Sequence, residues 1–368
     1  MIARLRSLTT QWTLLVPVLA IVLLVLTWGR DLPGAVVALV TVVLAGSVLA
    51  AVHHAEVIAH RVGEPFGSLV LVLAVAVTVI EVALIVTLMV DGGDKSATLA
   101  RDTVFAAVMI TCNGVVGLCL LVASLRHGTA VFNPEGTGAA LATVATLATL
   151  SLVLPTFTTS KPGPEFSGVQ LTFAALSSLI LYGLFVATQT VRHRDYFLPI
   201  TRQGEVITVD DHAAVPSART AWFSLGLLGL ALIGVVGLAK GVSPTIESGV
   251  EAAGLHQAVV GVIIALLVLL PETIAALRSA RRDRVQTSLN LALGSAMASI
   301  GLTIPAVALA SVWLSGRLVL GLGATHMLLL ALTVVVSSLT VVPGRATPLQ
   351  GGVHLVIFAA YLELAINP

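Results

Sequence analysis

The sequence predicts an all-α polytopic membrane protein with about eleven transmembrane helices, a lone first helix followed by two inverted five-helix repeats. The first observation is composition: of 368 residues, 57% are apolar and only 10% are charged, with a mean hydropathy of +1.04. A soluble domain carries about 25% charged residues, so a soluble enzyme, a nucleic-acid binder and a disordered protein are excluded. The second observation is a series of long apolar runs, and the third is an internal repeat.

The apolar runs give the elements in order. A spanning helix needs about 20 predominantly apolar residues. The first run follows Arg4 and Arg6 and has no small-x-small cleavage site before Arg30, so we predict a retained span rather than a signal peptide. The ninth run is long and contains Pro305, which marks a candidate kink or break. The runs cover residues 12–28, 34–52, 68–90, 103–124, 138–155, 171–190, 221–239, 257–277, 286–314, 319–342 and 351–366.

Basic residues in the loops predict the orientation of these spans. The N-terminus and every second loop after it hold 13 of the 19 Lys and Arg residues. Because cytoplasmic loops are enriched in Lys and Arg, we expect a multi-pass protein of the inner membrane with a cytoplasmic N-terminus and an external C-terminus. The predicted organisation is a first helix in 1–30, a first repeat in 34–190, a cytoplasmic connecting loop in 191–220 and a second repeat in 221–368.

The repeat emerges when the chain is compared with itself. A shift of 191 residues aligns Glu56 with Glu247 and Glu81 with Glu272. After a change in loop length, Thr111 aligns with Ser295 and Gly117 with Gly301. The paired glutamates fall in the third and eighth spans, and this odd separation gives the halves opposite directions in the membrane. Many secondary transporters have such a repeat and bind substrate near the midplane where the halves meet.

Glu81 and Glu272 are acids inside apolar spans. Each costs roughly 2.5–3.5 kcal/mol at the centre of a spanning helix unless it finds partners. Desolvation disfavours the charged carboxylate, so the low-energy states are the protonated acid and the carboxylate paired with a cation. Two carboxylates are neutral with one divalent cation or with two protons. The pair therefore predicts exchange of a cation for protons.

The polar residues of the fourth and ninth spans indicate which cation fits. Calcium takes six to eight oxygen ligands, and Pro271 next to Glu272 frees a backbone carbonyl one turn earlier. A thiolate or imidazole cluster, which zinc and copper prefer, is missing from this depth of the sequence. The candidate cation and proton ligands beside the two glutamates are Thr111, Asn113, Asn290, Ser295 and Ser299.

A second polar constellation is "HHAEVIAHR" at the end of the second span. Glu56 and His60 are four residues apart, which puts them on one helical face, and His53 and His54 lie one turn earlier. The order of a zinc hydrolase, His-Glu-x-x-His, is not present. We favour a protonatable vestibule here, and the alternative is the metal site of an intramembrane enzyme.

Two segments carry a family resemblance. "HHAEVIAHRVGEPFGSLVLVLAVAVTVIEVALI" and "LLVLLPETIAALRSARRDRVQTSLNLALGSAMASIGLTIPAVALA" closely resemble the bacterial calcium/proton antiporters of the calcium/cation antiporter superfamily. The resemblance implies an eleven-span fold with two inverted repeats. It also implies cation binding in alternation with protons by Glu81 and Glu272, with Ser295 similar to the polar ligand of the second repeat. In many members a Gly-Asn-Ala-x-Glu motif contains each glutamate, whereas here "TVI" and "LLP" precede them.

The leading hypothesis is a secondary active transporter that exchanges cytoplasmic Ca²⁺ for external protons by alternating access. Na⁺ and K⁺ are further candidate ions, because members of this branch are associated with them as well. The expected partners are the transported ions and the lipid bilayer, without cofactor or nucleic acid. The alternatives are the metal-dependent intramembrane enzyme at the histidine cluster and a passive cation channel.

Overall fold

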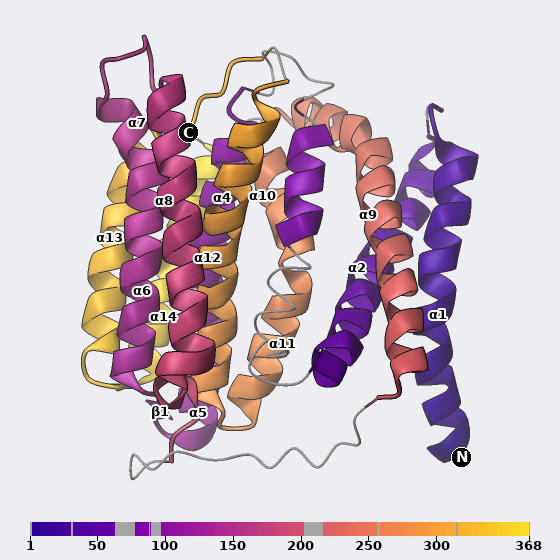
Figure 1. The fold of residues 1–368 in the computed structure, drawn as a ribbon, viewed down its shortest axis with the longest axis horizontal. Helices are drawn as coiled ribbons and strands as arrows, with labels where there is room; N and C mark the ends of the chain where they lie inside the picture. The colour runs from indigo at the N-terminus through magenta and orange to yellow at the C-terminus, as the bar shows by residue number, and fades with distance from the viewer. Residues whose placement is uncertain are drawn as a thin grey trace.

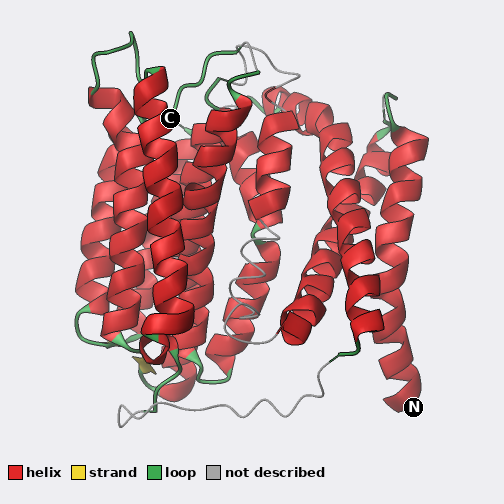
Figure 2. Ribbon diagram, in the orientation of Figure 1, coloured by secondary structure: helices red, strands yellow, loops and turns green. Residues whose placement is uncertain are grey.

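The computed structural model describes residues 2–30, 32–62, 78–87, 89, 97–201, 216–255, 258–313 and 316–367, with side chains described from Trp12 onward in the first helix. Most of the third predicted span (68–90) and the stretch 202–215 of the predicted connecting loop lie outside the described residues. Figure 2 shows that the described chain is helical apart from connections and two short strands.

The elements follow one another along the chain. The first half contains α1 (Ile2–Thr27), α2 (Gly34–Val62), the helix Thr78–Thr87, α4 (Leu99–Met109), η2 (Ile110–Val115), α5 (Val116–His127), β1 (Ala130–Val131), α6 (Pro134–Ala148), η3 (Thr149–Val153), α7 (Leu154–Phe157), α8 (Gly168–Ala187), η4 (Thr188–Arg192) and η5 (Arg194–Phe197). The second half contains α9 (Ala218–Ala252), α10 (Ala258–Val268), α11 (Leu270–Arg281), α12 (Val285–Ala310), α13 (Ala324–Val341), β2 (Arg345–Ala346) and α14 (Pro348–Ile366).

The helices fit the predicted spans. Among the described residues, eight helical stretches are long and apolar enough to cross a membrane, and α10 with α11 forms a ninth that bends by 56°. Two shorter apolar helices, Trp12–Thr27 and Thr78–Thr87, fall within the remaining predicted spans. The described helices are therefore compatible with eleven crossings. The proline in the ninth span does not break it, because α12 continues through Pro305.

All four tryptophans of the chain are exposed. Trp12 begins the apolar part of the first helix, Trp12–Thr27, and Trp28 directly follows it, so the two are about 24 Å apart at 1.5 Å per residue. Trp222 lies near the start of α9 and Trp313 just after α12. Tryptophan is enriched at both membrane interfaces, which flank a hydrocarbon layer of about 30 Å. The two termini lie at opposite ends of the bundle (Figure 1), as an odd number of crossings requires.

The bundle has two apolar clusters. Helices α1, α2 and α9 pack side by side (Figure 1) around a small cluster of their own that includes Ala20, Leu44 and Leu238. We call these helices the three-helix unit. The remaining helices share one large core, to which α2 and α9 also contribute Val48, Val52 and Val235. Packing of α1 on α9 is close, because a Cβ atom added at Gly234 would lie 2.8 Å from the Cβ of Ala20.

The helix contacts are compatible with the inverted repeat. Helices α2 and α9, the first of each predicted repeat, pack together and run in opposite directions (Figure 1). Gly117 and Gly301, aligned in the sequence, make equivalent contacts with the last helix of the other half. A Cβ at Gly117 would lie 2.9 Å from the Cβ of His354 on α14, and one at Gly301 would lie 2.7 Å from the Cβ of Tyr182 on α8. Small residues permit such close approach in membranes.

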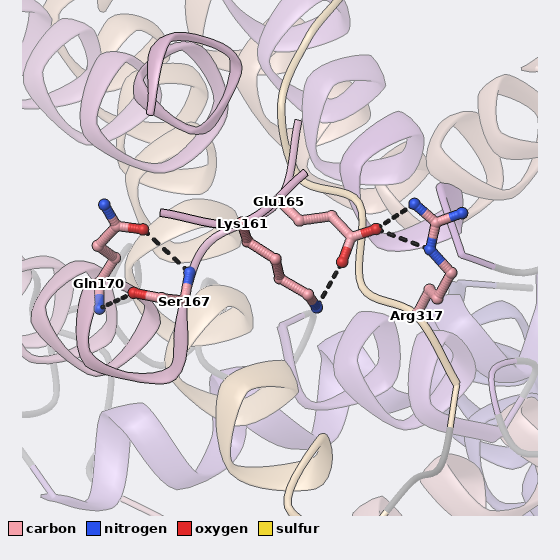
Figure 3. A network of polar contacts seen from close by, with 5 residues as sticks. All are labelled: Lys161, Glu165, Ser167, Gln170 and Arg317. Atoms are coloured by element: carbon pink, nitrogen blue, oxygen red, sulfur yellow. Dashed lines mark hydrogen bonds and ion pairs between the residues drawn. The ribbon is translucent and has the colours of Figure 1, made fainter. Parts of the chain in front are cut away.

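The end of the bundle opposite the N-terminus is fastened by one buried carboxylate. Glu165, only 1% exposed, accepts a hydrogen bond of 2.8 Å from Arg317 Nε and pairs with Lys161 Nζ at 2.5 Å (Figure 3). Beside it, Ser167 and Gln170 form the capping box that begins α8. The network joins the α7–α8 connection to the segment after α12.

Burial and ion pairing act in opposite directions on Glu165. Burial alone would raise the pKa of its carboxyl, but the hydrogen bonds and charges of Lys161 and Arg317 outweigh it and hold the pKa below the usual value of 4.5. A carboxylate whose pKa is lower in the folded state stabilises the fold above the unfolded-state pKa. That stabilisation is lost as the pH falls through the folded-state pKa.

The contact between α5 and α14 gives a first prediction. A Cβ at Gly351 would lie 2.6 Å from the backbone nitrogen of Leu121, whereas one at Gly352 would meet nothing within 4 Å. We expect Gly351→Ala to lower the free energy of unfolding by roughly 1–3 kcal/mol through overpacking. Gly352→Ala should be neutral or slightly stabilising, because alanine is the better helix former. Thermal unfolding in detergent measures both, and equal midpoints would contradict this account of the contact.

The Glu165 network gives a second prediction. At neutral pH, Glu165→Gln should reduce the free energy of unfolding by roughly 1.5–3 kcal/mol, the usual contribution of a hydrogen bond to a charged group. The difference from wild type should shrink as the pH falls below about 4.5, because the unfolded carboxylate then takes up a proton, and it should vanish once the folded carboxylate is protonated as well. The control is Glu135→Gln, a change at an exposed carboxylate. A difference that does not depend on pH would refute the role of the ion pairs.

Candidate functional site

Glu81 and Glu272 are buried in the middle of the helical bundle. Glu81 lies in the helix Thr78–Thr87 and Glu272 in the first turn of α11, and each side chain is only 3% exposed. The two carboxylates are close enough for their charges to interact. The structure thus brings together two acids that are far apart in the sequence and come from different halves of the chain.

Helix α12 supplies a hydroxyl to each carboxylate. Ser299 Oγ donates to Glu81 and lies 2.5 Å from Oε1 and 2.7 Å from Oε2. Ser295 Oγ donates to Glu272 Oε1 at 3.5 Å. The two serines are four residues apart and therefore share one helical face. This face of α12 is the surface on which the two glutamates meet.

One oxygen of the site has no donor. Glu272 Oε2 is buried and makes no hydrogen bond to the described residues. An unpaired buried acceptor loses its hydration without compensation, which costs about 1–3 kcal/mol, and more when the group is charged. A cation or a proton at this oxygen would remove the penalty.

A break between two helices lies directly before Glu272. Helix α10 ends at Val268, α11 begins at Leu270, and Pro271 provides no N–H for a continuous helix. Glu272 therefore lies at a helix N-terminus, where the dipole favours negative charge. Discontinuous helices with ends directed at ions are characteristic of transporter binding sites.

Three of the predicted ligands are not brought to the carboxylates. The amide of Asn113 has other partners. Its Nδ2 donates to Thr333 Oγ1 at 2.9 Å, and its Oδ1 lies 3.2 Å from His354 Nδ1. Thr111 Oγ1 donates to the carbonyl of Ala107 in its own helix at 2.7 Å. In neither case does the hydroxyl or amide donate to a glutamate.

Asn290 belongs to a different cluster. Its Nδ2 donates to the carbonyl of Phe197 at 2.6 Å, and its Oδ1 accepts from Gln286 Nε2 at 2.9 Å. Asn290 precedes Ser295 by five residues, which rotates it about 140° around the helix axis. It therefore ties α12 to η5 and lies on another face than the serines.

The histidine cluster of α2 packs against α1. His54 is buried with Nε2 3.0 Å from the carbonyl of Thr13, and its ring meets the His53 ring edge-on at 5.4 Å. His60 is exposed near the end of the helix. Within the described residues, no group of three or more His, Cys, Asp and Glu side chains is placed to hold a metal ion.

Glu56 lies on the same stretch of α2 and feels the charge of Arg278 on α11. Helix α2 of the three-helix unit packs against α11 of the large core. The predicted protonatable vestibule at His53, His54, Glu56 and His60 stays a prediction.

Sequence reasoning did not single out His354 or the π-helical segment η2. His354 is an ionisable residue inside the predicted span 351–366, and that signal was available in the sequence. The π-helical turn has no comparable sequence signal, because "ITCNGV" is compatible with an ordinary α-helix.

Comparison with known proteins identifies the family and the fold. The model of the family described as "sodium/calcium exchanger protein" matches twice, at residues 32–191 and 223–367, once on each half. The proposed ionic transporter y4hA of Sinorhizobium fredii is 47% identical, over 97% of this chain and 96% of its own. The sodium-potassium/proton antiporter ChaA of Escherichia coli is 36% identical, over 96% and 95%. The crystal structure of the H⁺/Ca²⁺ exchanger CAX has the same fold, with a TM-score of 0.69 and 18% identity, over 95% of this chain and 87% of that one.

Proposed function

The chain belongs to the sodium/calcium exchanger protein family, and we propose that it exchanges cytoplasmic cations for external protons at Glu81 and Glu272. Its relatives are ion exchangers rather than enzymes. The chain is accordingly an ion transporter, and the metal-dependent enzyme considered from the sequence is wrong. The proposal concerns the ions, the direction of exchange and the residues that bind them.

The observation that carries the proposal is the meeting of two buried carboxylates on the serine face of α12. When the site is empty and both acids are ionised, the pair holds two negative charges out of water. Burying each of these charges costs several kcal/mol. Two protons neutralise the pair, and so does one divalent cation or two monovalent ones. Only neutral forms can be enclosed and moved across the midplane at low free energy, so cation and proton must replace each other.

The oxygens at the site suit a hard cation. The two carboxylates offer four oxygens and Ser295 and Ser299 offer two more, which together reach the lower limit of the six to eight that Ca²⁺ takes. The CAX exchanger, which shares the fold, carries Ca²⁺, whereas ChaA is a sodium-potassium/proton antiporter. We therefore propose Ca²⁺ as one cargo, and Na⁺ and K⁺ as others.

The packing suggests which part moves. The three-helix unit of α1, α2 and α9 has its own apolar cluster and packs beside the large core that holds both glutamates. We propose that alternating access comes from sliding or rocking of this unit against that core. We also propose that the protein lies in the inner membrane with its N-terminus in the cytoplasm, an orientation that the excess of basic residues in alternate loops supports.

The test is proton-coupled exchange in inside-out vesicles. When respiration has acidified the vesicle interior, adding Ca²⁺, Na⁺ or K⁺ outside should release protons, which recovery of acridine orange fluorescence reports. Each ion is tested separately across pH. Uptake of radioactive Ca²⁺ that continues without any proton release would indicate a channel instead.

Substitution of the glutamates gives the third prediction. Glu81→Gln and Glu272→Gln each keep the shape of the site but cannot release a proton or balance a cation. Exchange should fall at least about 100-fold, which is the upper end of the loss from removing an outer-shell partner of a metal. The control is Glu363→Gln on α14, where the carboxylate is exposed and accepts from Asn367. Wild-type exchange in both glutamate variants would show that the site lies elsewhere.

A further inference from the structure

A second buried polar cluster, around His354, plays no part in the exchange proposed above. His354 on α14 is fully buried, at 0% exposed. Its Nδ1 lies 3.2 Å from Asn113 Oδ1, and its Nε2 lies 3.2 Å from Thr340 Oγ1 on α13. An ionisable residue within a membrane span is retained at a cost and usually has a function.

The hydrogen bonds around Asn113 fix the position of one proton on the ring. Thr333 Oγ1 donates its only proton to the carbonyl of Leu329 at 2.8 Å, so it accepts from Asn113 Nδ2. The amide oxygen of Asn113 therefore faces His354. Because an amide oxygen only accepts, Nδ1 of His354 must carry a proton.

The other ring nitrogen can stay without a proton. Thr340 Oγ1 lies 3.2 Å from His354 Nε2 and 2.9 Å from the carbonyl of Val336, and its hydroxyl can donate to either. When the Thr340 hydroxyl donates to Nε2, a neutral ring with its proton on Nδ1 has a hydrogen bond on both sides. This assignment gives His354 a donor role toward Asn113 without a buried charge.

Asn113 lies in the π-helical segment η2, which interrupts the fourth span. The backbone N–H of Val116 donates to the carbonyls of Asn113 and Thr111. It does not donate to the carbonyl of Cys112, which would be its acceptor in a regular α-helix. Single π-helical turns are rare and occur frequently at functional sites. Through its hydrogen bond to Asn113, His354 supports a side chain of this turn.

The η2 turn contacts helices of both polar groups. It packs against α11 and α12, which carry Glu272 and the two serines, and also against α13 and α14. The ring itself is held in place, because the Cβ of His354 lies against Gly117 with no room for a side chain there. Tyr182, which makes the equivalent contact with Gly301, is aromatic but not an imidazole, so the arrangement belongs to one half of the molecule only.

We propose that His354 is a positioning residue for the cation site: its Nδ1–H holds Asn113, and through Asn113 the η2 turn that lies against α11 and α12. The inference rests on the function proposed above. It assigns to α14 a control of cation affinity that does not involve contact with the ion. Partners that orient the ligands of a metal site typically change its affinity 10- to 100-fold when they are removed.

The test uses three substitutions that separate the two ring nitrogens. In His354→Asn, the amide nitrogen can take the place of Nδ1 and donate to Asn113. In His354→Gln, the amide reaches the place of Nε2 and leaves Asn113 without its donor. His354→Leu removes both contacts. Ser338→Ala on α13 is the control, because this exposed hydroxyl bonds only within its own helix, to the carbonyl of Val334.

The measurement is the Ca²⁺ concentration that gives half-maximal exchange, together with the maximal rate, in the inside-out vesicles. For His354→Gln and His354→Leu we expect the half-maximal concentration to rise roughly 10-fold or more, with a maximal rate within about twofold of wild type. His354→Asn and Ser338→Ala should stay close to wild type. Half-maximal concentrations that are equal in all variants would overturn the proposal, and so would an asparagine variant as weak as the leucine variant.

A second measurement separates this inference from the proposed function. Purified protein in detergent is titrated with CaCl₂, and the concentration that half-maximally raises the unfolding temperature is determined for each variant. Absence of exchange in wild-type vesicles would refute the proposed function alone. The titration then decides the inference: the same order of variants supports it, and identical titrations overturn it even if some variants fold poorly in the membrane.

Discussion

The burial of two carboxylates in a membrane-spanning bundle is the constraint on which the rest of this structure depends. Each ionised acid taken from water into such a bundle costs several kcal/mol unless charge and hydrogen bonds compensate it. Helix α12 provides part of the compensation through Ser295 and Ser299, and the break before Glu272 provides a helix N-terminus. Neither supplies a full positive charge. The site therefore remains incomplete until a proton or a cation arrives, and this incompleteness is what makes it suited to exchange.

The predicted inverted repeat accounts for how such a site is built from one chain. Two halves of opposite direction would place matched residues on both sides of a common centre, so one glutamate per half would suffice for a pair. The glycines at 117 and 301 do the same structural work in each half, since both allow the last helix of the other half to approach closely. The polar groups are less symmetric than the backbone: both serines belong to α12, and the histidine with its amide partner belongs to α14 and the fourth span. Affinity and coupling can thus be adjusted in one half while the other keeps the scaffold.

Much of the site could be predicted from the sequence, because depth and spacing are one-dimensional properties. An acid after a long apolar run is recognisable, and the four-residue spacing of Ser295 and Ser299 puts both on one face. Thr111, Asn113 and Asn290 were expected at the site for their depth alone, but depth does not determine which way a side chain points around its helix. A π-helical turn further changes that direction at Asn113. The prolines show the same limit, since Pro271 follows a break whereas α12 runs unbroken through Pro305.

The contacts that hold the bundle also determine where motion is least costly. Backbone atoms touch where α14 meets α5, and the Glu165 network fastens the connections of the large core at one end. Displacement there would break close packing and a buried ion pair together. The three-helix unit has a small apolar cluster, and apolar surfaces that slide past each other keep most of their burial. If neutralising the glutamates allows part of this protein to move, the moving part should be α1, α2 and α9, because these helices are held less tightly than the large core. The core that contains the serine face of α12 then stays as it is, and the same six oxygens can receive the ion from either side.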